Sequence, residues 1–423
     1  MKRNRCNRNR HPRREPVRKR RQRQLQRSMR RARARKLQHE RTKTEKMYQS
    51  AAESIVKRTF GKLLHCKQTL SILMAVTGVL FANRLSIAAI GRAMARFFGG
   101  SQKHGIKQVD RLLSNDKLML PTLFEGYVSL MIGTRRRALV TFDWTDFDKD
   151  DHSTLVISLV AAETKRAIPL IWRTVYKSKL KGNQRRHERE LLATLRRLVP
   201  MKVHLIVLSD RGFGDVALYR YMRKLNMDFI TRFRSDIGVE YMEYVMDAEK
   251  LVPRNGRIRL IKQTRLTRNR KGIYNVVLVK KAGMKDPWCL ATSLDLPKED
   301  IVALYGCRFQ CEEAFRDAKN IRYGLGLSQT RISLPERRDR MFMLFCLAYL
   351  VHTAAGATSE DTEVDKTIRA NTETKRRTHS LFRQGMELLG HASREIYKAI
   401  KSGFKARIRD LLRKGADVAF ATG

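Results

Sequence analysis

Between residues 137 and 233, short runs rich in β-branched residues alternate with helical patterns in an order that restricts how a sheet can be assembled. The first three runs, ALVTFDWT, STLVISLVA and AIPLIWRTV, are spaced like consecutive antiparallel strands. A helical pattern over about 184–198 comes next, followed by the run VHLIVLS, a helical pattern over about 214–225 and the run DFITRF. Each run is short and apolar enough to be a buried strand, so the region predicts a sheet with helices between its later strands.

The order of three strands, helix, strand, helix and strand predicts an α/β fold with an RNase H-like core. That topology brings the first and fourth strands side by side. The first strand delivers Asp143 and the fourth ends in Asp210, at the edge where open α/β sheets place their ligand crevice. We therefore expect both carboxylates to reach a common metal. Taken alone, Asp210 could merely cap the helix that begins near Gly214, and Asp143 could be a polar residue at a strand end.

A third candidate acid belongs to a helical pattern about a hundred residues further along the chain. At about 100° per residue, four side chains fall within a stripe roughly 60° wide: Tyr305, Arg308, Glu312 and Lys319. The neighbouring stripe is apolar and consists of Leu304, Cys307, Cys311, Ala314 and Ala318. The pattern predicts one α-helix with a core-facing flank and a second flank that offers an acid, two cations and a phenol. Glu313 adjoins Glu312 without sharing its spacing, and a solvated, salt-bridged helix face is the alternative interpretation.

Two strand-borne aspartates and one helix-borne glutamate are suited to a pair of divalent cations. Mg²⁺ is a hard cation that keeps waters and prefers carboxylate oxygens. Two such ions close together can stabilise both the attacking and the leaving oxygen of a phosphodiester displacement. The combination of Asp143, Asp210 and Glu312 therefore predicts phosphoryl-transfer chemistry, with cations nearby to hold phosphate.

The pattern Tyr305-x2-Arg308-x3-Glu312-x6-Lys319 resembles the signature of DDE transposases from one large group of bacterial insertion sequences, named for its tyrosine, arginine, glutamate and lysine (YREK). The stretches TFDWTDF around Asp143 and LSDRGF around Asp210 resemble that group's two catalytic aspartates, and the resemblance covers roughly residues 80–350. It implies that Asp143, Asp210 and Glu312 form the metal-binding catalytic triad. It also implies that Arg308 and Lys319 grip phosphates of the transposon end while Tyr305 helps to position them.

This resemblance implies an enzyme that carries out Mg²⁺-dependent cut-and-paste transposition of an insertion sequence. Two Mg²⁺ ions per site, with Mn²⁺ able to substitute, would support hydrolytic nicking at the element's ends and then strand transfer by the freed 3′-hydroxyl. The partners would be the inverted-repeat ends and the target, both double-stranded DNA, and a second copy of the chain in a homodimer. Two alternatives stay open: a metal-dependent DNA nuclease without strand transfer, and a catalytically inactive DNA-binding relative.

The charge of the chain agrees with a polyanionic partner. The formal net charge is +48 over 423 residues, and residues 1–36 hold 18 Lys or Arg against the single acid Glu15. Neutralising many phosphates gives sequence-independent affinity that falls steeply with salt. With almost no apolar residues, the tail is expected to be disordered when free and to act as a DNA arm. Alternatively, translation begins later, for instance at Met47, and charge alone would also fit RNA or an anionic membrane.

The region from about 48 to 130 is predicted to be helical. The run LSIAAIGRAMA, the break Gly99-Gly100 and the run SQKHGIKQVDRLLSN resemble two helices around a turn. In a helix-turn-helix, the second helix would direct four polar side chains to the major groove: Lys103, His104, Lys107 and Gln108. A plain helical bundle with a charged outer face is the alternative. The transposase resemblance favours DNA contact, because that group has an amino-terminal helical domain that binds the element's ends.

We expect the following division: a basic disordered tail (1–46), a helical DNA-binding domain (47–130), the core in two parts (131–232 and 296–358), an inserted β-rich subdomain (233–295) and C-terminal helices (359–423). The apolar runs 69–82 and 341–357 are interpreted as buried helices, so no membrane partner is expected. No GxxxxGK[ST] sequence supports ATP binding. Six cysteines without a CxxC pair and the absence of a secretory signal favour the cytoplasm. The transposase resemblance implies a bacterial, nucleoid-associated protein.

Overall fold

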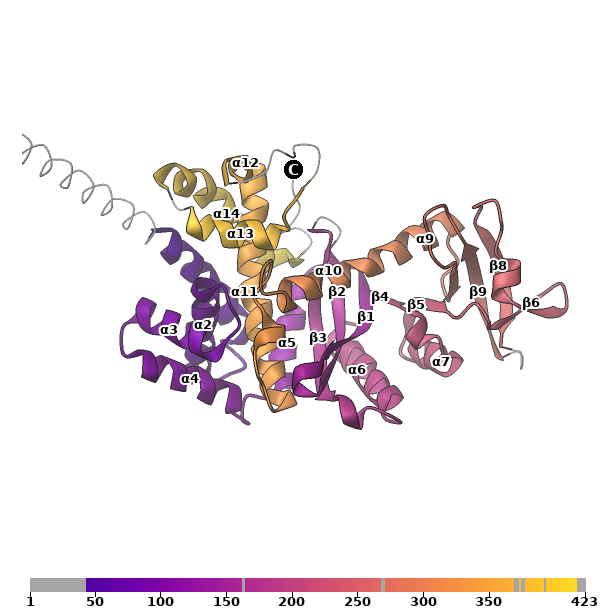
Figure 1. Ribbon diagram of the computed structural model, residues 1–423, viewed down its shortest axis with the longest axis horizontal. Coiled ribbons are helices and arrows are strands. Elements are labelled where there is room, and N and C mark those ends of the chain that lie inside the picture. The colour runs from indigo at the N-terminus through magenta and orange to yellow at the C-terminus, as the bar shows by residue number, and fades with distance from the viewer. Residues whose placement is uncertain are drawn as a thin grey trace, which may run out of the picture.

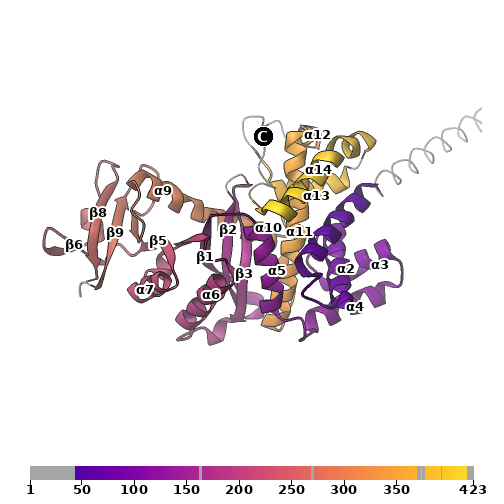
Figure 2. The same ribbon diagram turned by 180° about the vertical axis from the view of Figure 1, so that it is seen from behind.

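The structure is a computed structural model that describes residues 43–161, 164–267, 271–368, 373, 377–391 and 393–416. The predicted basic tail lies almost entirely outside these residues. Figure 1 shows three parts in a row: a helical end with α2 to α4, a central sheet, and a β-rich end with β6, β8 and β9. The view from behind in Figure 2 shows the same order, with α11 between the helical end and the sheet.

The central sheet has the neighbours that the sequence order predicts. Its first strands are β1 (Arg137–Phe147), β2 (His152–Ala161), β3 (Arg166–Tyr176), β4 (His204–Ser209) and β5 (Met227–Phe233). They lie in the order β3-β2-β1-β4-β5. β1 is antiparallel to β2 and parallel to β4, with Phe142 opposite Ser209. The connecting helices are α6 (Gln184–Leu198) and α7 (Val216–Lys224). Strands one and four are therefore paired directly.

The β-rich segment after β5 continues the same sheet. It contains β6 (Gly238–Tyr241), β7 (Tyr244–Asp247), α8 (Ala248–Leu251), β8 (Arg259–Leu266), β9 (Lys271–Val279) and β10 (Trp288–Thr292). β10 pairs antiparallel with β5, and the sheet then runs β10-β9-β8-β6-β7. In the part of the chain that the structure describes, ten strands thus form one sheet. The segment expected as an inserted subdomain extends the core through backbone hydrogen bonds.

Alternation of buried side chains along the shared strands gives the sheet two apolar faces. On one face, Leu205, Val207 and Phe229 join the large core cluster. On the opposite face, Ile206, Leu208 and Ile230 form a smaller cluster with residues of β9, β10 and α9 (Lys298–Gly306). Because successive strand residues point to opposite faces, β4 and β5 are buried on both sides. This burial holds the end of β4, and with it Asp210, at a fixed position.

The segment that carries the four-residue pattern is not a single α-helix. It consists of α9, the 3₁₀ turn η5 (Cys307–Phe309) and α10 (Gln310–Lys319). The backbone of Gly306 and Phe309 stays in the right-handed helical region, so the three pieces follow one another almost as one rod (Figure 1). A 3₁₀ turn has three residues per turn and not 3.6, so the angular spacing of side chains across η5 differs from that of a continuous α-helix. α10 packs against β1, β2 and β3.

The helical end begins with a helix over residues 43–60, followed by α2 (Cys66–Ala82), α3 (Ile87–Phe98), α4 (Gln102–Ser114) and α5 (Leu120–Ile132). Ser86 and Ser101 cap α3 and α4, and both Gly99 and Gly100 between them have positive φ. α3 and α4 cross where Gly91 meets Gly105, since a Cβ added to Gly105 would lie 2.3 Å from the Gly91 carbonyl oxygen. The two predicted helices around a turn are therefore present.

The C-terminal part is built on α11 (Pro335–Asp361), which contacts α2, β3, α13 (Leu381–Gly390) and α14 (Arg394–Lys414). In the chain, the short helix α12 (Val364–Ile368) lies between α11 and α13. Within the described residues, α11 is long and apolar enough to span a membrane, as is the pair α2 and α3 if counted as one bent span. The apolar window of α11 is 100% buried, as in the core helix of a globular fold. The predicted boundaries near 46, 130 and 358 each fall inside a helix.

Candidate functional site

Asp143 and Asp210 occupy equivalent positions on two neighbouring parallel strands. The pairing between β1 and β4 ends at Phe142 and Ser209. The two aspartates directly follow these residues in the chain. Burial, and after it the nearby negative charge of Asp210, raise the pKa of Asp143 to about 6, against the opposing effect of Arg308. Like charges that share a site make ionisation of a carboxyl harder. The two aspartates that the sequence singled out are thus electrostatic neighbours.

Asp210 also has the capping role that was its alternative interpretation. Its Oδ1 accepts a hydrogen bond of 2.9 Å from the backbone N–H of Gly212, at the start of the 3₁₀ turn η4 (Arg211–Phe213). The following helix α7 is capped by a different residue, Asp215, through the N–H of Ala217. Capping uses one carboxylate oxygen of Asp210, so the two roles do not exclude each other.

Glu312 and Asp143 meet at a shared cation, the guanidinium of Arg308. One terminal nitrogen of Arg308 lies 2.8 Å from Glu312 Oε1, and the other lies 3.5 Å from Asp143 Oδ2. The Arg308 side chain is 9% exposed, whereas that of Glu312 is 53% exposed. A planar fork can serve two carboxylates at once, which a single ammonium group cannot do as well. Arg308 therefore connects β1, which carries Asp143, with α10, which carries Glu312.

Tyr305 does not lie on an open flank with the other three residues of the pattern. It is 1% exposed and belongs to the smaller apolar cluster, where its ring meets Trp288 at 4.9 Å in an edge-on contact. Burial raises the pKa of its hydroxyl to about 12, while Arg308 acts in the opposite direction. The hydroxyl is therefore enclosed, and the predicted role of Tyr305 in positioning phosphates stays a prediction. Tyr305 packs α9 onto the sheet beside Arg308.

Lys319 reaches the far part of β1. Its Nζ donates to Thr145 Oγ1 at 2.9 Å and to the backbone carbonyl of Asp146 at 2.6 Å, and it lies 4.6 Å from the ring centroid of Phe147. Burial lowers the pKa of the ammonium group, partly offset by nearby Asp146. Lys319 thus fastens the end of α10 to the strand that carries Asp143.

An open depression of about 690 Å³ lies where these groups come together. Its lining includes Asp143, Glu312 and Lys319, and the segment after α10 contributes Asn320 and Ile321. Two acids and a cation of the predicted set therefore share one surface hollow. Asp210 and Arg308 do not line it.

Two contacts of the site were missed by sequence reasoning. The thiol of Cys311, which was assigned to the apolar stripe, lies 3.6 Å from Asp143 Oδ2. The indole N–H of Trp144 donates to Glu188 Oε1 at 3.3 Å, and the fully buried Glu188 pairs with Arg185 at 2.7 Å. A charged residue within the apolar spacing of α6 was the available signal for Glu188, but its partner depends on how α6 packs.

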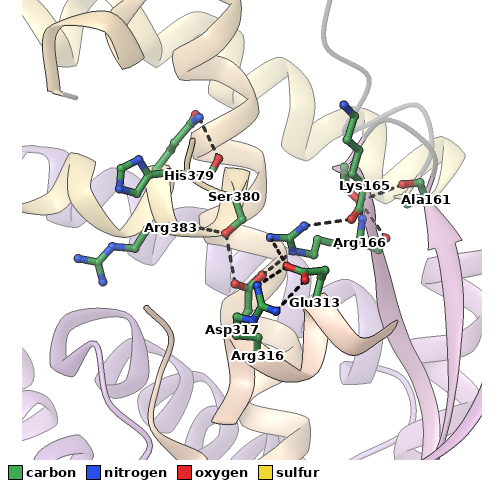
Figure 3. A network of polar contacts seen from close by, with 11 residues as sticks. Ala161, Lys165, Arg166, Glu313, Arg316, Asp317, His379, Ser380 and Arg383 are labelled. Carbon is green, nitrogen blue, oxygen red and sulfur yellow. Dashed lines mark hydrogen bonds and ion pairs between the residues drawn. The ribbon is translucent and has the colours of Figure 1, made fainter. Parts of the chain in front are cut away.

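Glu313, the neighbour that could be confused with Glu312, points into a different network (Figure 3). It pairs with Arg316 at 3.0 Å and with Arg166 of β3 at 3.3 Å. Arg166 also contacts Asp317 at 3.3 Å, and Asp317 accepts a hydrogen bond from Ser380, the cap of α13. Glu312, which the helical spacing favours, therefore shares Arg308 with Asp143, whereas Glu313 pairs with other arginines.

The donor set suits a hard divalent cation. Carboxylate oxygens of Asp143 and Glu312 already share one positive group, and the charge of Asp210 adds to the demand for another. Oxygen ligands of this kind fit Mg²⁺. Among the residues that the structure describes, no three His, Cys, Asp or Glu side chains are gathered closely enough to form a metal site as they stand. Holding a cation would therefore require Glu312, the exposed member, to turn toward the aspartates.

The predicted major-groove side chains lie on the outer part of α4. Lys103, His104 and Lys107 are exposed and Gln108 is half-buried, whereas Gly105 and Val109 face α3 and the core. The arrangement leaves these polar side chains accessible to a ligand. It agrees with a helix-turn-helix and equally with a charged outer face of a helical bundle.

Comparison with known proteins covers the site residues that follow β3 in the chain. Residues 173–351 match the family described as the transposase DDE domain. The match supports a DDE transposase, an enzyme that acts on DNA. It includes Asp210, Tyr305, Arg308, Glu312 and Lys319 and begins after Asp143, so the case for Asp143 rests on its position directly after the last β1–β4 pair and on its contact with Arg308. No curated protein matches the chain.

Proposed function

We propose that this chain is a cut-and-paste transposase of a bacterial insertion sequence, built on an RNase H-like core and belonging to the YREK group. The observation that carries the proposal is the Arg308 bridge between Asp143 and Glu312, next to the strand pair that brings Asp143 beside Asp210. Asp143 is the electrostatic neighbour of Asp210 and shares Arg308 with Glu312, although these acids are far apart in sequence. A carboxyl such as Asp143, whose pKa is shifted by burial and by a charged neighbour at the lining of an open hollow, is a candidate functional group.

In this proposal Asp143, Asp210 and Glu312 hold two divalent cations, Mg²⁺ by preference. When bound, these ions would supply charge stabilisation to the attacking and leaving oxygens of a phosphodiester. The same site would serve hydrolytic nicking at the element's ends and attack by the freed 3′-hydroxyl on the target. Both reactions are phosphodiester displacements, so one arrangement of ligands can support them.

Cationic side chains would guide the DNA. Lys319 lines the hollow beside Asp143 and is placed to meet a phosphate as a point charge. Arg308 keeps Asp143 and Glu312 together and would turn to phosphate when these carboxylates take a metal. At the helical end, Lys103 and Lys107 of α4 are proposed to contact the element's terminal DNA. A homodimer would place one site at each end, in the bacterial cytoplasm.

The test compares two neighbouring acids of α10. The purified chain is incubated with Mg²⁺ and a plasmid that carries the genomic flanks of the reading frame, and cut and joined strands are separated on a denaturing gel. Glu312→Gln should abolish both products while duplex binding is retained, because it removes a ligand charge and little volume. Glu313→Gln, which pairs on the other side of α10, should retain most activity.

The outcomes separate the alternatives. Cutting without joined products would indicate a nuclease. Duplex binding without any Mg²⁺-dependent cleavage would indicate an inactive relative. Glu312→Gln that cuts as fast as the parent would remove Glu312 from the site. Short inverted repeats in the flanks would independently support the insertion-sequence context.

A further inference from the structure

The helix over residues 43–60 and α14 enclose a groove of about 580 Å³ on the side of the molecule that holds the C-terminal helices. Its floor is apolar: Met47, Phe404 and Ile408 are buried members of the main core cluster. The ring of Phe404 stacks on Tyr48 with centroids 5.5 Å apart, which ties the two helices together below the groove. The groove is therefore supported by packed core residues.

Along α14 the groove is bordered by two parallel rows. One row is cationic and consists of Lys401, Lys405, Arg409 and Arg413. The other row is apolar and consists of Phe404, Ile408 and Leu412. Residues four apart lie one above the other on a helix, so each set forms a continuous line. Like charges at this spacing destabilise a helix, and an anionic ligand along the row would relieve that repulsion.

The opposite wall, on the first helix, is low and also cationic. Its lining residues toward the middle are small, Ser50, Ala51 and Ser54, and Lys43 and Lys46 stand at its start. Among the described residues that line the groove, every charged side chain is a cation. Small residues on one wall and larger apolar residues on the other leave room for a rod-like segment, with the cationic row of α14 along one side and Lys43 and Lys46 at one end of the other.

We propose that this groove binds an acidic amphipathic α-helix of a partner protein. The lining stretch 397–413 of α14 rises about 24 Å at 1.5 Å per residue, the length of a four-to-five-turn helix. The apolar stripe of such a helix would cover the floor, and its acidic residues would meet the cationic row of α14 and, at one end, Lys43 and Lys46. Neither the activity proposed above nor the residues of its site enter into this binding.

Other occupants fit less well. A DNA backbone would match the cations but would leave the apolar floor uncovered, because phosphates and sugars carry no apolar side chains to fill it. The chain's own residues 1–36 carry 18 Lys or Arg against one acid, so they would add repulsion. A second copy has the same strongly positive net charge.

The test uses a fluorescent 16-residue peptide with Leu at helical i, i+3, i+4 and i+7 positions and Glu on both flanks, titrated with the full chain in an anisotropy assay. Binding by the parent is expected. The double variant Lys405→Glu and Arg409→Glu should weaken it at least tenfold. The matched control, Arg394→Glu and Lys398→Glu, has the same four-residue spacing on exposed positions of α14 outside the groove and should stay within about twofold of the parent.

A second variant separates the groove from general electrostatic attraction. Ser50→Trp, at an exposed lining position, leaves the net charge unchanged and fills the groove, so it should also weaken peptide binding at least tenfold. Circular dichroism melting confirms that each variant is folded. No binding to the parent, or equal binding to the parent and to Ser50→Trp, would overturn the proposal. So would a result in which the groove variants weaken a 20-base-pair duplex and leave the peptide unaffected.

Discussion

The two sides of α10 use acidic residues in opposite ways. On the side toward β1, Glu312 has a side chain that is 53% exposed and one cationic partner, Arg308. On the other side, Asp317 is 6% exposed and is held by Arg166 and Ser380, which belong to β3 and to the cap of α13 (Figure 3). One helix thus carries an acid that can change partners and an acid that is enclosed by them.

This difference separates a candidate ligand from a structural support. An exposed carboxylate gives up little when it exchanges an arginine for a metal ion, because solvent reaches it in both states. A buried, hydrogen-bonded carboxylate is costly to disturb, since removing either partner leaves a charge without compensation. We therefore expect changes on the β1 side to affect cleavage, and changes on the β3 side to affect folding.

The largest expected effect is on the β1 side. Asp143→Asn should reduce strand cleavage by about 1000-fold or more, since it removes a ligand charge from a group of residues that act together. The same change should leave the melting temperature unchanged or raise it, because Asp143 is a buried carboxyl whose pKa is raised next to Asp210. Cleavage on end-labelled DNA and calorimetry on the same preparation check both parts. A variant that unfolds and loses activity together would contradict the assignment.

On the β3 side, Asp317→Ala should lower the free energy of unfolding by about 3 kcal/mol, because it leaves the largely buried Arg166 without its aspartate partner. Urea unfolding followed by fluorescence gives the change. Glu53→Gln removes one partner of a surface pair with Lys57 and should leave the transition midpoint unchanged. If Asp317→Ala were as stable as the parent but inactive, Asp317 would belong to the site and not to the support.

Arg308→Lys tests whether the bridge requires a fork. It keeps the positive charge, but one ammonium group cannot contact Asp143 and Glu312 in the same way. Cleavage should fall about tenfold, as is typical for residues that orient ligands. Arg316→Lys, on the exposed pair with Glu313, is the matched control and should cleave like the parent. Equal activities of the two variants would show that Arg308 contributes only charge.

Much of this comparison was accessible from the sequence. The strand order and both aspartates follow from local apolar runs, because a buried strand between helices leaves few arrangements of the sheet. The choice of Glu312 over Glu313 came from helical spacing, and the structure places these two acids in separate networks. The match to the transposase DDE domain begins only at residue 173 and therefore leaves out Asp143. The pairing of β1 with β4 supplies the evidence for that residue.

Other features depend on long-range packing. The 3₁₀ turn at 307–309 interrupts the predicted helix, and Tyr305, just before the turn, is buried in the smaller apolar cluster. Asp317 has two partners that are distant in sequence: Arg166 is 151 positions away and Ser380 is 63 positions away. The pairing of β10 with β5, which joins the β-rich segment to the core sheet, is likewise not encoded in any local pattern.

The last prediction concerns protons. Burial is the main cause that raises the pKa of both Asp143 and Asp317 to about 6. The charge of Asp210 contributes to the rise for Asp143, which Arg308 opposes, and Arg166 opposes the rise for Asp317. A carboxyl whose folded pKa exceeds its ordinary value favours the folded state at low pH. That contribution is fully present below about pH 4 and is lost as pH rises through about 6, by up to about 3 kcal/mol per carboxyl.

Mg²⁺ should affect these two losses differently. It binds the ionised form of Asp143 and so reduces that loss, whereas Asp317 keeps its arginine and serine in either case. The measurement is the stability difference between the parent and Asp143→Asn from pH 4 to 7, with EDTA or with Mg²⁺. We expect the stability difference between the parent and Asp143→Asn to change with pH in EDTA and to depend less on pH in Mg²⁺. The stability difference between the parent and Asp317→Asn should be the same with EDTA and with Mg²⁺. A metal-independent profile for Asp143→Asn would mean that no cation binds at that carboxylate, and the contrast between the two sides of α10 would reduce to burial alone.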